Sequence, residues 1–289
     1  MDAASRSTCR RGRRRAAPTP PLEATIARAG ADPSALDVAE VDVAEVDVAE
    51  VDVASAALLD EVAGKKILAD AGVEIPAGQL TSAANAPSVA TTIGFPVAVK
   101  LVHADLPHKT EAGAVRLGLD SAIDVATAVD EICRSVAKFR PGLVADRFLV
   151  ERMVPKPIVE LLVGIRHDPL FGPVMLVGAG GTMVEIWRDT ATLLLPTDPA
   201  SIRDALLSLR IAPIFKGFRG APAVELDRIV EAIDRLAAFG YAQRGRLVEL
   251  DVNPLMVLPD RAVAADVVLR MAGAPATSSG AATGRTKSV

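Results

Sequence analysis

The sequence predicts an α+β fold with two lobes and a cleft between them. In residues 55–271, apolar residues recur with either the helical period of 3.6 or the strand period of 2. The strands expected from this pattern come in groups ahead of the helices, whereas strict alternation of strand and helix would favour a parallel sheet. Grouped strands therefore indicate separate sheets with helices packed on them.

Each element follows from a local pattern. A helix is expected within residues 58–70, where Leu58, Val62 and Leu68 are spaced for one face and Gly72 is suited to the C-terminal cap. Further helices are predicted at Pro87–Ile93, Ile123–Phe139, Pro199–Leu209 and Val224–Phe239. Strands are predicted at Val97–Val102, Val115–Leu119, Phe148–Val154, Val159–Ile165, Val174–Val177, Met183–Trp187, Leu247–Val252 and Val263–Val268.

The two ends of the chain have a different character. An arginine cluster and a proline-rich stretch are followed by the unit Asp-Val-Ala-Glu-Val, which begins at Asp37 and recurs at Asp42 and Asp47. A five-residue period matches neither a helix face nor a strand face, so this segment predicts a low-complexity linker. We expect residues 1–54 to be a disordered tail, 55–271 one folded domain and 272–289 a second disordered tail.

Composition excludes several classes of protein. The 289 residues carry a formal net charge of -4, which argues against a dedicated nucleic-acid binder. An apolar run of the roughly 18 to 20 residues needed to cross a bilayer is absent, so no membrane association is expected. The two cysteines, Cys9 and Cys133, form no disulfide framework, and a cytoplasmic location is predicted.

Two features could bind phosphate groups. Lys100 ends an apolar strand, where a fixed ammonium group suits a nucleotide phosphate, although an ordinary surface lysine is the alternative. The segment Gly178-Ala-Gly-Gly181 follows another apolar strand, and glycines there let backbone N–H groups approach phosphate oxygens. A simple hairpin turn explains the same glycines equally well.

Acidic residues could bind a metal or a nucleoside. Glu249, Asp251, Asn253 and Asp266 come from two adjacent predicted strands, and hard oxygen ligands of this kind can hold Mg²⁺ against substrate phosphates. Period two places the first three on one strand face. Glu151 and Glu160 flank a turn between strands, where carboxylates can accept hydrogen bonds from ribose or adenine.

His108 lies beside Lys109 in a polar loop that spans residues 103–112. A loop histidine is usually solvated and inert, but histidine can also carry a phosphoryl group on a ring nitrogen. The residues alone leave both interpretations open.

Taken in order, several segments resemble the ATP-grasp half of ADP-forming acyl-CoA synthetases and, more distantly, the beta subunit of succinyl-CoA synthetase. The match covers about three quarters of the chain without a break in order. The matching segments are Gly94–Lys100, His108–Gly118, Val150–Val154, Val159–Asp168, Phe171–Val174, Gly178–Glu185, Phe215–Gly220 and Glu249–Leu255.

The resemblance implies an ATP-grasp fold that binds ATP or ADP with Mg²⁺ in its cleft. It assigns Lys100 to the nucleotide phosphates, Glu151 and Met153 to the adenine hinge, and Glu160 to the ribose. Gly178, Gly180 and Gly181 would cover the phosphates, Asn253 and Asp266 would ligate Mg²⁺, and His108 would relay phosphate between a partner's phosphohistidine and ADP.

Two departures from the family pattern bear on function. Ala114 stands where the family usually has a second glycine. The CoA-binding and phosphohistidine domains of the full enzyme are missing, so we expect an alpha-type partner subunit to supply them. Two alternatives remain: a non-catalytic nucleotide-binding regulatory module, and an ATP-grasp ligase that forms an acyl phosphate without CoA.

Overall fold

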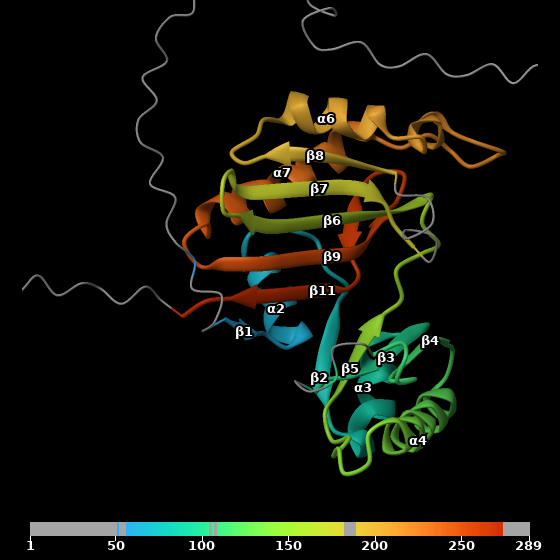
Figure 1. Ribbon diagram of the computed structural model, residues 1–289. Helices are drawn as coiled ribbons and strands as arrows, with labels where there is room; N and C mark the ends of the chain where they lie inside the picture. The colour runs from blue at the N-terminus through green and yellow to red at the C-terminus, as the bar shows by residue number, and fades with distance from the viewer. Residues whose placement is uncertain (1–50, 52–55, 104–105, 107–108, 182–188, 274–289) are drawn as a thin grey trace, which may run out of the picture. The chain divides into compact units, whose positions relative to one another are not determined.

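The computed structural model describes residue 51 and residues 56–103, 106, 109–181 and 189–273. Within these residues the strands form two antiparallel sheets, and helices pack on each of them (Figure 1). This arrangement confirms the α+β prediction, because neither sheet is built from alternating strand–helix–strand units.

The larger sheet contains the longest strands. Its order is β1 (Ala57–Leu58), β11 (Val267–Met271), β9 (Leu247–Val257), β6 (Val159–Asp168), β7 (Gly172–Ala179) and β8 (Thr190–Leu194), and β10 (Ala262–Ala264) pairs with β9. Every neighbouring pair is antiparallel. Alternate residues of β6, namely Leu161, Val163 and Ile165, are fully buried, as period two requires for a sheet with one face in the core.

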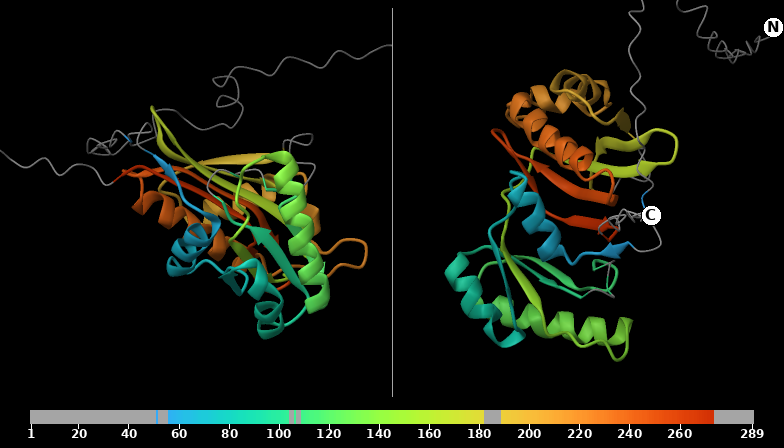
Figure 2. Two further views of the ribbon diagram at one scale, coloured as in Figure 1. Left: turned by 90° about the horizontal axis from the view of Figure 1, so that it is seen from below. Right: turned by 90° about the vertical axis from the view of Figure 1, so that its left-hand side faces the viewer.

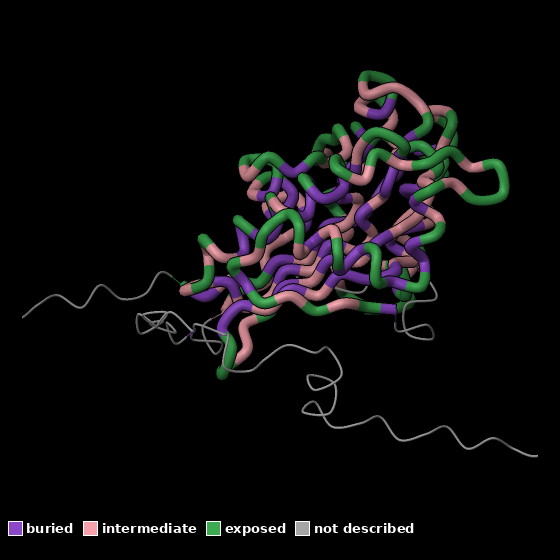
Figure 3. The backbone as a smooth tube through the Cα atoms, turned by 90° about the horizontal axis from the view of Figure 1, so that it is seen from above, coloured by how far each residue is buried: buried purple, intermediate pink, exposed green. Residues whose placement is uncertain are grey.

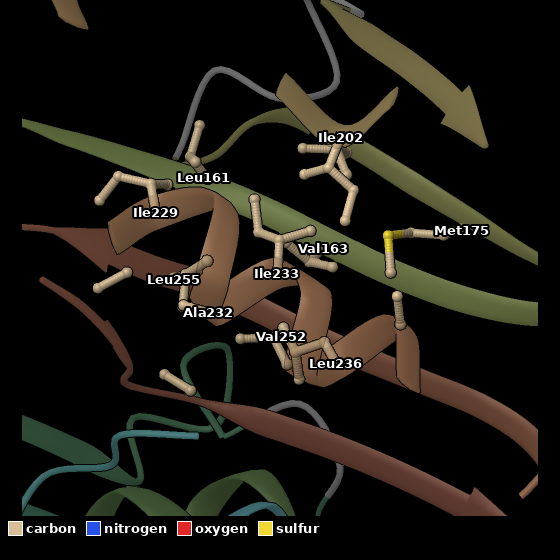
Figure 4. Close-up of a cluster of buried hydrophobic side chains, with 14 of the residues drawn as sticks. Leu161, Val163, Met175, Ile202, Ile229, Ala232, Ile233, Leu236, Val252 and Leu255 are labelled. Atoms are coloured by element: carbon tan, nitrogen blue, oxygen red, sulfur yellow. The ribbon is translucent and has the colours of Figure 1, made fainter. Parts of the chain in front are cut away.

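Helices cover the buried face of this sheet. Helix α7 (Leu226–Ala242) places Ile229, Ile233 and Leu236 against the buried side chains of β6 and β9 (Figure 4). Helix α6 (Pro199–Ser208) packs on β8 and α7, while the 3-10 helix η4 (Ala212–Lys216) follows it (Figure 2). The apolar stripe on α7 therefore joins sheet and helices into one core.

Helix α2 (Glu61–Asp70) packs against β11 of the same sheet. The helix ends as the sequence indicated, because Gly72 adopts a φ of +85° and its N–H bonds the carbonyl of Ala69 at 2.9 Å. The next N–H, of Val73, reaches the carbonyl of Leu68 at 3.0 Å. Glycine suits this left-handed position because it has no β-carbon.

The smaller sheet has its own core. Its order is β2 (Gly78–Thr81), β5 (Phe148–Arg152), β3 (Val97–Leu101) and β4 (Val115–Leu119). Helices α3 (Ala86–Ile93) and α4 (Ala122–Phe139) pack on it, and the short 3-10 helix η3 (Ala83–Asn85) precedes α3. The buried residues of β3, β5 and α4 form a cluster separate from that of the larger sheet. Figure 3 marks the buried, intermediate and exposed residues along the backbone.

Several strands differ from the sequence prediction. β1, β2 and β8 were not predicted, because they are short and lie at or near sheet edges, where the burial pattern is weak. The predicted strand Val263–Val268 is instead the two strands β10 and β11, separated by Ala265 and Asp266. The predicted strand Met183–Trp187 lies outside the described residues.

Across the described parts of the chain, no helix combines the length and the apolar character that a bilayer crossing requires.

The packing of α7 leads to a stability prediction. Ile233 is fully buried, so Ile233→Ala should lower the free energy of unfolding by about 2–5 kcal/mol through lost apolar contact and a residual cavity. Leu207 on α6 is 42% exposed, and Leu207→Ala should cost about 0.5 kcal/mol or less. Urea denaturation of both variants checks this, and equal losses would contradict the assignment of the core.

Candidate functional site

Lys100 lies on β3, all of whose residues are buried, and its side chain points into the protein. Its ammonium group is 2.7 Å from Glu61 Oε1 and 3.0 Å from Glu151 Oε2, and it donates to the carbonyl oxygen of Ala265 at 2.9 Å. At 7% exposure, Lys100 is not an ordinary surface lysine. These three contacts match the three donors of an ammonium group.

Lys100 belongs to a larger group of charges, here called the ion-pair cluster, which comprises Glu61, Lys65, Lys100, Lys109, Glu151 and Asp266. Lys65 Nζ lies 2.5 Å from Glu151 Oε1 and 2.9 Å from Glu61 Oε1. Glu61, Lys65 and Glu151 are each no more than 4% exposed. The buried centre therefore holds two carboxylates against two ammonium groups, as burial of charge requires.

The edge of the ion-pair cluster is more open. Lys109 forms an ion pair with Glu61 Oε2, and its ammonium group lies 3.5 Å from Asp266 Oδ1. The Lys109 side chain is 13% exposed and that of Asp266 is 40% exposed. One carboxylate, that of Glu61, thus contacts three lysines, and Asp266 balances the outermost of them.

The cluster fixes the charge states of its members. Burial alone would raise the pKa of Glu61, but the ammonium groups of Lys100, Lys65 and Lys109 outweigh burial and hold the pKa below its usual range. Burial alone would lower the pKa of Lys100, but Glu61 and Glu151 raise it above the usual value. The pKa of Lys65 is lowered, by burial and then by the nearby charge of Lys100.

Local sequence explains how α2 delivers Glu61. The Asp60 carboxylate caps the helix by accepting from the N–H of Ala63 at 2.9 Å, so Glu61 begins the first turn. Gly64 faces β11, where a β-carbon would lie 3.4 Å from Val267 Cγ1 and 3.6 Å from Leu269 Cβ. Sequence reasoning missed Glu61 and Lys65, although a Glu–Lys pair on the same helix face as the buried Leu68 was an available signal.

Oxygen donors gather next to the cluster. The N–H of Asn253 bonds the carbonyl of Asp266 at 3.3 Å, so these two residues are neighbours across β9 and the segment before β11. Glu249, Asp251 and Asn253 share one face of β9, because Leu250 and Val252 between them are buried. Burial, followed by the charge of Glu249, raises the pKa of Asp251.

These residues fit a Mg²⁺ ion. Mg²⁺ prefers oxygen ligands and is usually held by one or two carboxylates together with substrate phosphates. Asn253 and Asp266 are neighbours through their backbone bond, each has a side-chain oxygen, and both residues are only partly buried. Asp251 and Asn253 also line a pocket of about 590 Å³ on the sheet face opposite the helices, with Leu162 and Leu176 in its floor.

The predicted glycines lie at the end of β7, and close packing accounts for each. A β-carbon on Gly178 would come within 2.6 Å of Thr190 Cγ2, and one on Gly180 within 2.7 Å of the Leu161 carbonyl carbon. Gly181 has a φ of +84° and faces the carboxylate of Glu160. Glu160, Gly180 and Gly181 together line a pocket of about 430 Å³.

The two predicted hinge residues have different surroundings. Met153 follows β5, donates its N–H to the Pro96 carbonyl at 3.0 Å and lines a pocket of about 580 Å³. The carboxylate of Glu151 is turned instead to Lys65 and Lys100. The structure thus brings Lys100, Glu151, Asn253 and Asp266 to one place, and Glu160, Gly180 and Gly181 to another. His108 lies outside the described residues.

Comparison with known proteins identifies the family. A family model described as an ATP-grasp domain matches residues 50–271. The chain therefore belongs to the ATP-grasp domain family, and the resemblance found in the sequence is confirmed.

Similar proteins include ones named as a CoA synthase and as a subunit of a CoA ligase. A trans-feruloyl-CoA synthase from an unidentified prokaryote is 34% identical over 71% of this chain, which spans 29% of that protein. The beta subunit of ADP-forming acetate–CoA ligase II from Pyrococcus furiosus is 29% identical over 68% of this chain and 84% of the subunit. The chain therefore corresponds in extent to a beta subunit and to a minor part of the longer relative.

Solved structures show the same fold. Acetyl-coenzyme A synthetase 1 of Candidatus Korarchaeum cryptofilum, in complex with coenzyme A, Ca-AMPCP and HgCl+, has a TM-score of 0.71 and 28% identity over 74% of this chain and 93% of its own. Another structure of that protein holds coenzyme A and Mg-AMPPCP, with a phosphohistidine segment pointing towards the nucleotide binding site. It has a TM-score of 0.63 and 26% identity over 73% of this chain and 91% of its own.

The ion-pair cluster leads to a pH prediction. Because the folded-state pKa of Glu61 is lowered, its charge stabilises the fold above the unfolded pKa, and this contribution is lost as pH falls. At pH 7, Glu61→Gln should lower the free energy of unfolding by about 3–5 kcal/mol, since it leaves the buried ammonium groups of Lys65 and Lys100 with the single carboxylate of Glu151 between them. The difference between wild type and variant should shrink by about 1.4 kcal/mol per pH unit below about pH 4.3.

Urea denaturation of both proteins between pH 7 and pH 3.3 measures this difference. The other titrating groups are common to the two proteins, so their effects largely cancel. A difference that stays constant over this range would show that the pKa of Glu61 is the same in the folded and the unfolded protein.

Proposed function

We propose that this chain is the ATP-grasp subunit, or the corresponding segment, of an ADP-forming acyl-CoA synthetase. The reaction is acyl-CoA + ADP + phosphate ⇌ carboxylate + ATP + CoA. Support comes from the collinear match to a ligase beta subunit over most of that subunit's length. We also propose a cytoplasmic location, in keeping with Cys133 being a free thiol.

The observation that carries the proposal is that Lys100 and Asn253 both bond the segment Ala265–Asp266, Lys100 at the Ala265 carbonyl and the Asn253 N–H at the Asp266 carbonyl. A lysine on a rigid strand and two adjacent oxygen ligands are what a Mg²⁺–nucleotide phosphate group requires. When bound there, Mg²⁺ would neutralise charge on the phosphates. Lys100 would bind and orient the phosphate oxygens in exchange for its present carboxylate partners.

The other predicted residues complete the nucleotide site in this proposal. Met153, which already lines a pocket, would contact adenine at the connection between β5 and β6. Glu160 would bind the ribose, and Gly178, Gly180 and Gly181 would lie over the phosphates. The carboxylate of Glu151 holds Lys100, so its assignment to the adenine hinge stays a prediction.

An alpha-type partner would supply the CoA-binding site and a phosphohistidine. A solved relative whose phosphohistidine segment points towards its nucleotide binding site supports this division of labour. We propose that the phosphoryl group passes from the partner's histidine to a ring nitrogen of His108, and then to the terminal oxygen of ADP. At each transfer one P–N bond breaks, while the new bond forms to nitrogen in the first step and to oxygen in the second.

Metal dependence tests the nucleotide half of the proposal. Asn253→Ala or Asp266→Ala should weaken binding of Mg-ATP at least about tenfold, because each removes a ligand of a metal that also contacts the phosphates. Binding of free ATP should change about twofold or less. Calorimetric titration with and without Mg²⁺ measures both affinities, and equal losses for the two ligands would refute the metal assignment.

Phosphoryl relay is tested with His108→Asn, which keeps a polar side chain of similar size but cannot carry phosphate. Nucleotide affinity should stay near the wild-type value. With a co-purified partner bearing radiolabelled phosphohistidine, the variant should neither acquire label nor pass it to ADP, because binding energy elsewhere cannot replace a covalent step. Rapid-quench sampling follows the label.

The outcomes separate the proposal from its alternatives. Transfer to ADP at the wild-type rate in the variant would make His108 an ordinary loop histidine. Nucleotide binding without any phosphate exchange in the wild-type protein would favour the non-catalytic regulatory module. Formation of an acyl phosphate from ATP and a free carboxylate, without CoA, would favour the ligase.

A further inference from the structure

Lys109 occupies a position in the ion-pair cluster that the family match leaves without a role. The two oxygens of the Glu61 carboxylate divide between two lysines, since Oε1 contacts Lys100 at 2.7 Å and Oε2 contacts Lys109. Two ammonium groups from different segments are thereby held at one carboxylate. Both also lie against the segment before β11, Lys100 at the Ala265 carbonyl and Lys109 at the Asp266 carboxylate.

The three lysines of the cluster differ in how accessible they are. Lys65 is 3% exposed and lies between Glu61 and Glu151, where its charge is fully matched. Lys109 is 13% exposed and lies at the edge, next to the more open Asp266. An incoming anion therefore reaches Lys109 without passing the buried centre, and Lys65 is left as an internal counter-charge.

Lys109 and Asp266 carry charges opposite to those of a bound phosphate and a bound metal ion, respectively. In the structure, Asp266 and Lys109 neutralise each other at 3.5 Å. If a cation binds at Asp266 and an anion binds at Lys109, two ion pairs replace this one. In each pair a side chain faces a charge of the opposite sign. The exchange leaves no charge unmatched, which keeps its electrostatic cost low in a partly buried place.

We propose that Lys109 binds the terminal phosphate of the nucleotide and that Glu61 is the positioning residue that holds Lys109 beside Lys100. The proposal rests on the nucleotide-binding function proposed above. Lys109 is assigned to the terminal phosphate because it neighbours Asp266, the proposed ligand of a metal that contacts the phosphates. Two lysines fixed at one carboxylate give a site for two phosphate charges with little rotamer entropy left to lose.

The test uses the full 289-residue chain and Lys109→Met, which keeps the length of the side chain and removes its charge. Affinity for Mg-AMPPCP should fall at least about tenfold, which corresponds to about 1.4 kcal/mol. Affinity for AMP, which lacks the β- and γ-phosphates, should change about twofold or less. Lys109→Arg should recover part of the loss, because it restores a positive charge at the site.

Lys66→Met is the matched control. Lys66 lies on α2 close to the cluster in sequence, but its side chain is 74% exposed and pairs only with Asp70 among the interactions described. This variant should bind both nucleotides as the wild type does. A Lys109→Met protein that binds Mg-AMPPCP with wild-type affinity, or that loses AMP affinity to the same extent, would overturn the proposal.

The positioning role is tested with Glu61→Asp, which retains the charge and withdraws the carboxylate by one methylene. It should weaken Mg-AMPPCP binding in the wild-type background and have a smaller effect when combined with Lys109→Met, because part of its action passes through Lys109. Equal effects in both backgrounds would show that Glu61 does not act through Lys109. Thermal unfolding of each variant confirms that the comparison is between folded proteins.

Two further measurements distinguish a failure of this inference from a failure of the proposed nucleotide-binding function. If the wild-type chain binds no Mg²⁺–nucleotide, both the proposed function and the inference about Lys109 are wrong. If the wild type binds and Lys100→Met weakens binding while Lys109→Met does not, only the inference about Lys109 fails.

Discussion

The carboxylate of Glu61 is the contact on which the arrangement of the site depends. It is almost fully buried, and a buried charge must be paired, so its neighbours cannot be placed freely. Lys65 of its own helix, Lys100 of β3 and Lys109 all converge on it. The hydrophobic clusters of the two sheets are separate, whereas Glu61 lies on a helix packed against β11 and Lys100 lies in the smaller sheet. Ionic contacts therefore connect side chains that belong to the two separate hydrophobic clusters' sheets.

This explains which parts of the fold the sequence could predict. The helices α4 and α7 have clear apolar faces, and the long strands alternate, so local periodicity was enough to find them. The edge strand β2 pairs with β5 through only four residues and buries little, so its sequence carries almost no pattern. The division of residues 262–271 into β10 and β11 depends on contacts with distant segments, such as the bond from the Ala264 N–H to the Glu74 carbonyl. Local sequence does not encode such contacts.

The candidate site was also predictable only in part, because local patterns reveal some of its residues and long-range contacts bring in the others. Lys100, Asn253 and Asp266 came from strand positions and a resemblance, and the structure brings them together. Glu61 and Lys65 were missed, because a Glu–Lys pair four residues apart on a helix normally indicates a solvated face. The glycines at the end of β7 were found in the sequence, but their role was ambiguous. Their sequence suggested a phosphate loop or a turn equally, while their closest neighbours are the backbones and side chains of β6 and β8.

The same cluster that stabilises the nucleotide-free protein also limits how a phosphate can enter. Lys100 already has three acceptors within 3.0 Å, so it can bind a phosphate oxygen only by giving up one of them. Releasing Glu151 would leave Lys65 as that carboxylate's remaining partner, and releasing Glu61 would leave it Lys65 and Lys109. Each carboxylate thus keeps at least one ammonium group after the exchange. The cluster as a whole is balanced, with three lysines and three carboxylates, so an anion that enters together with a cation at Asp266 leaves no buried charge without a partner.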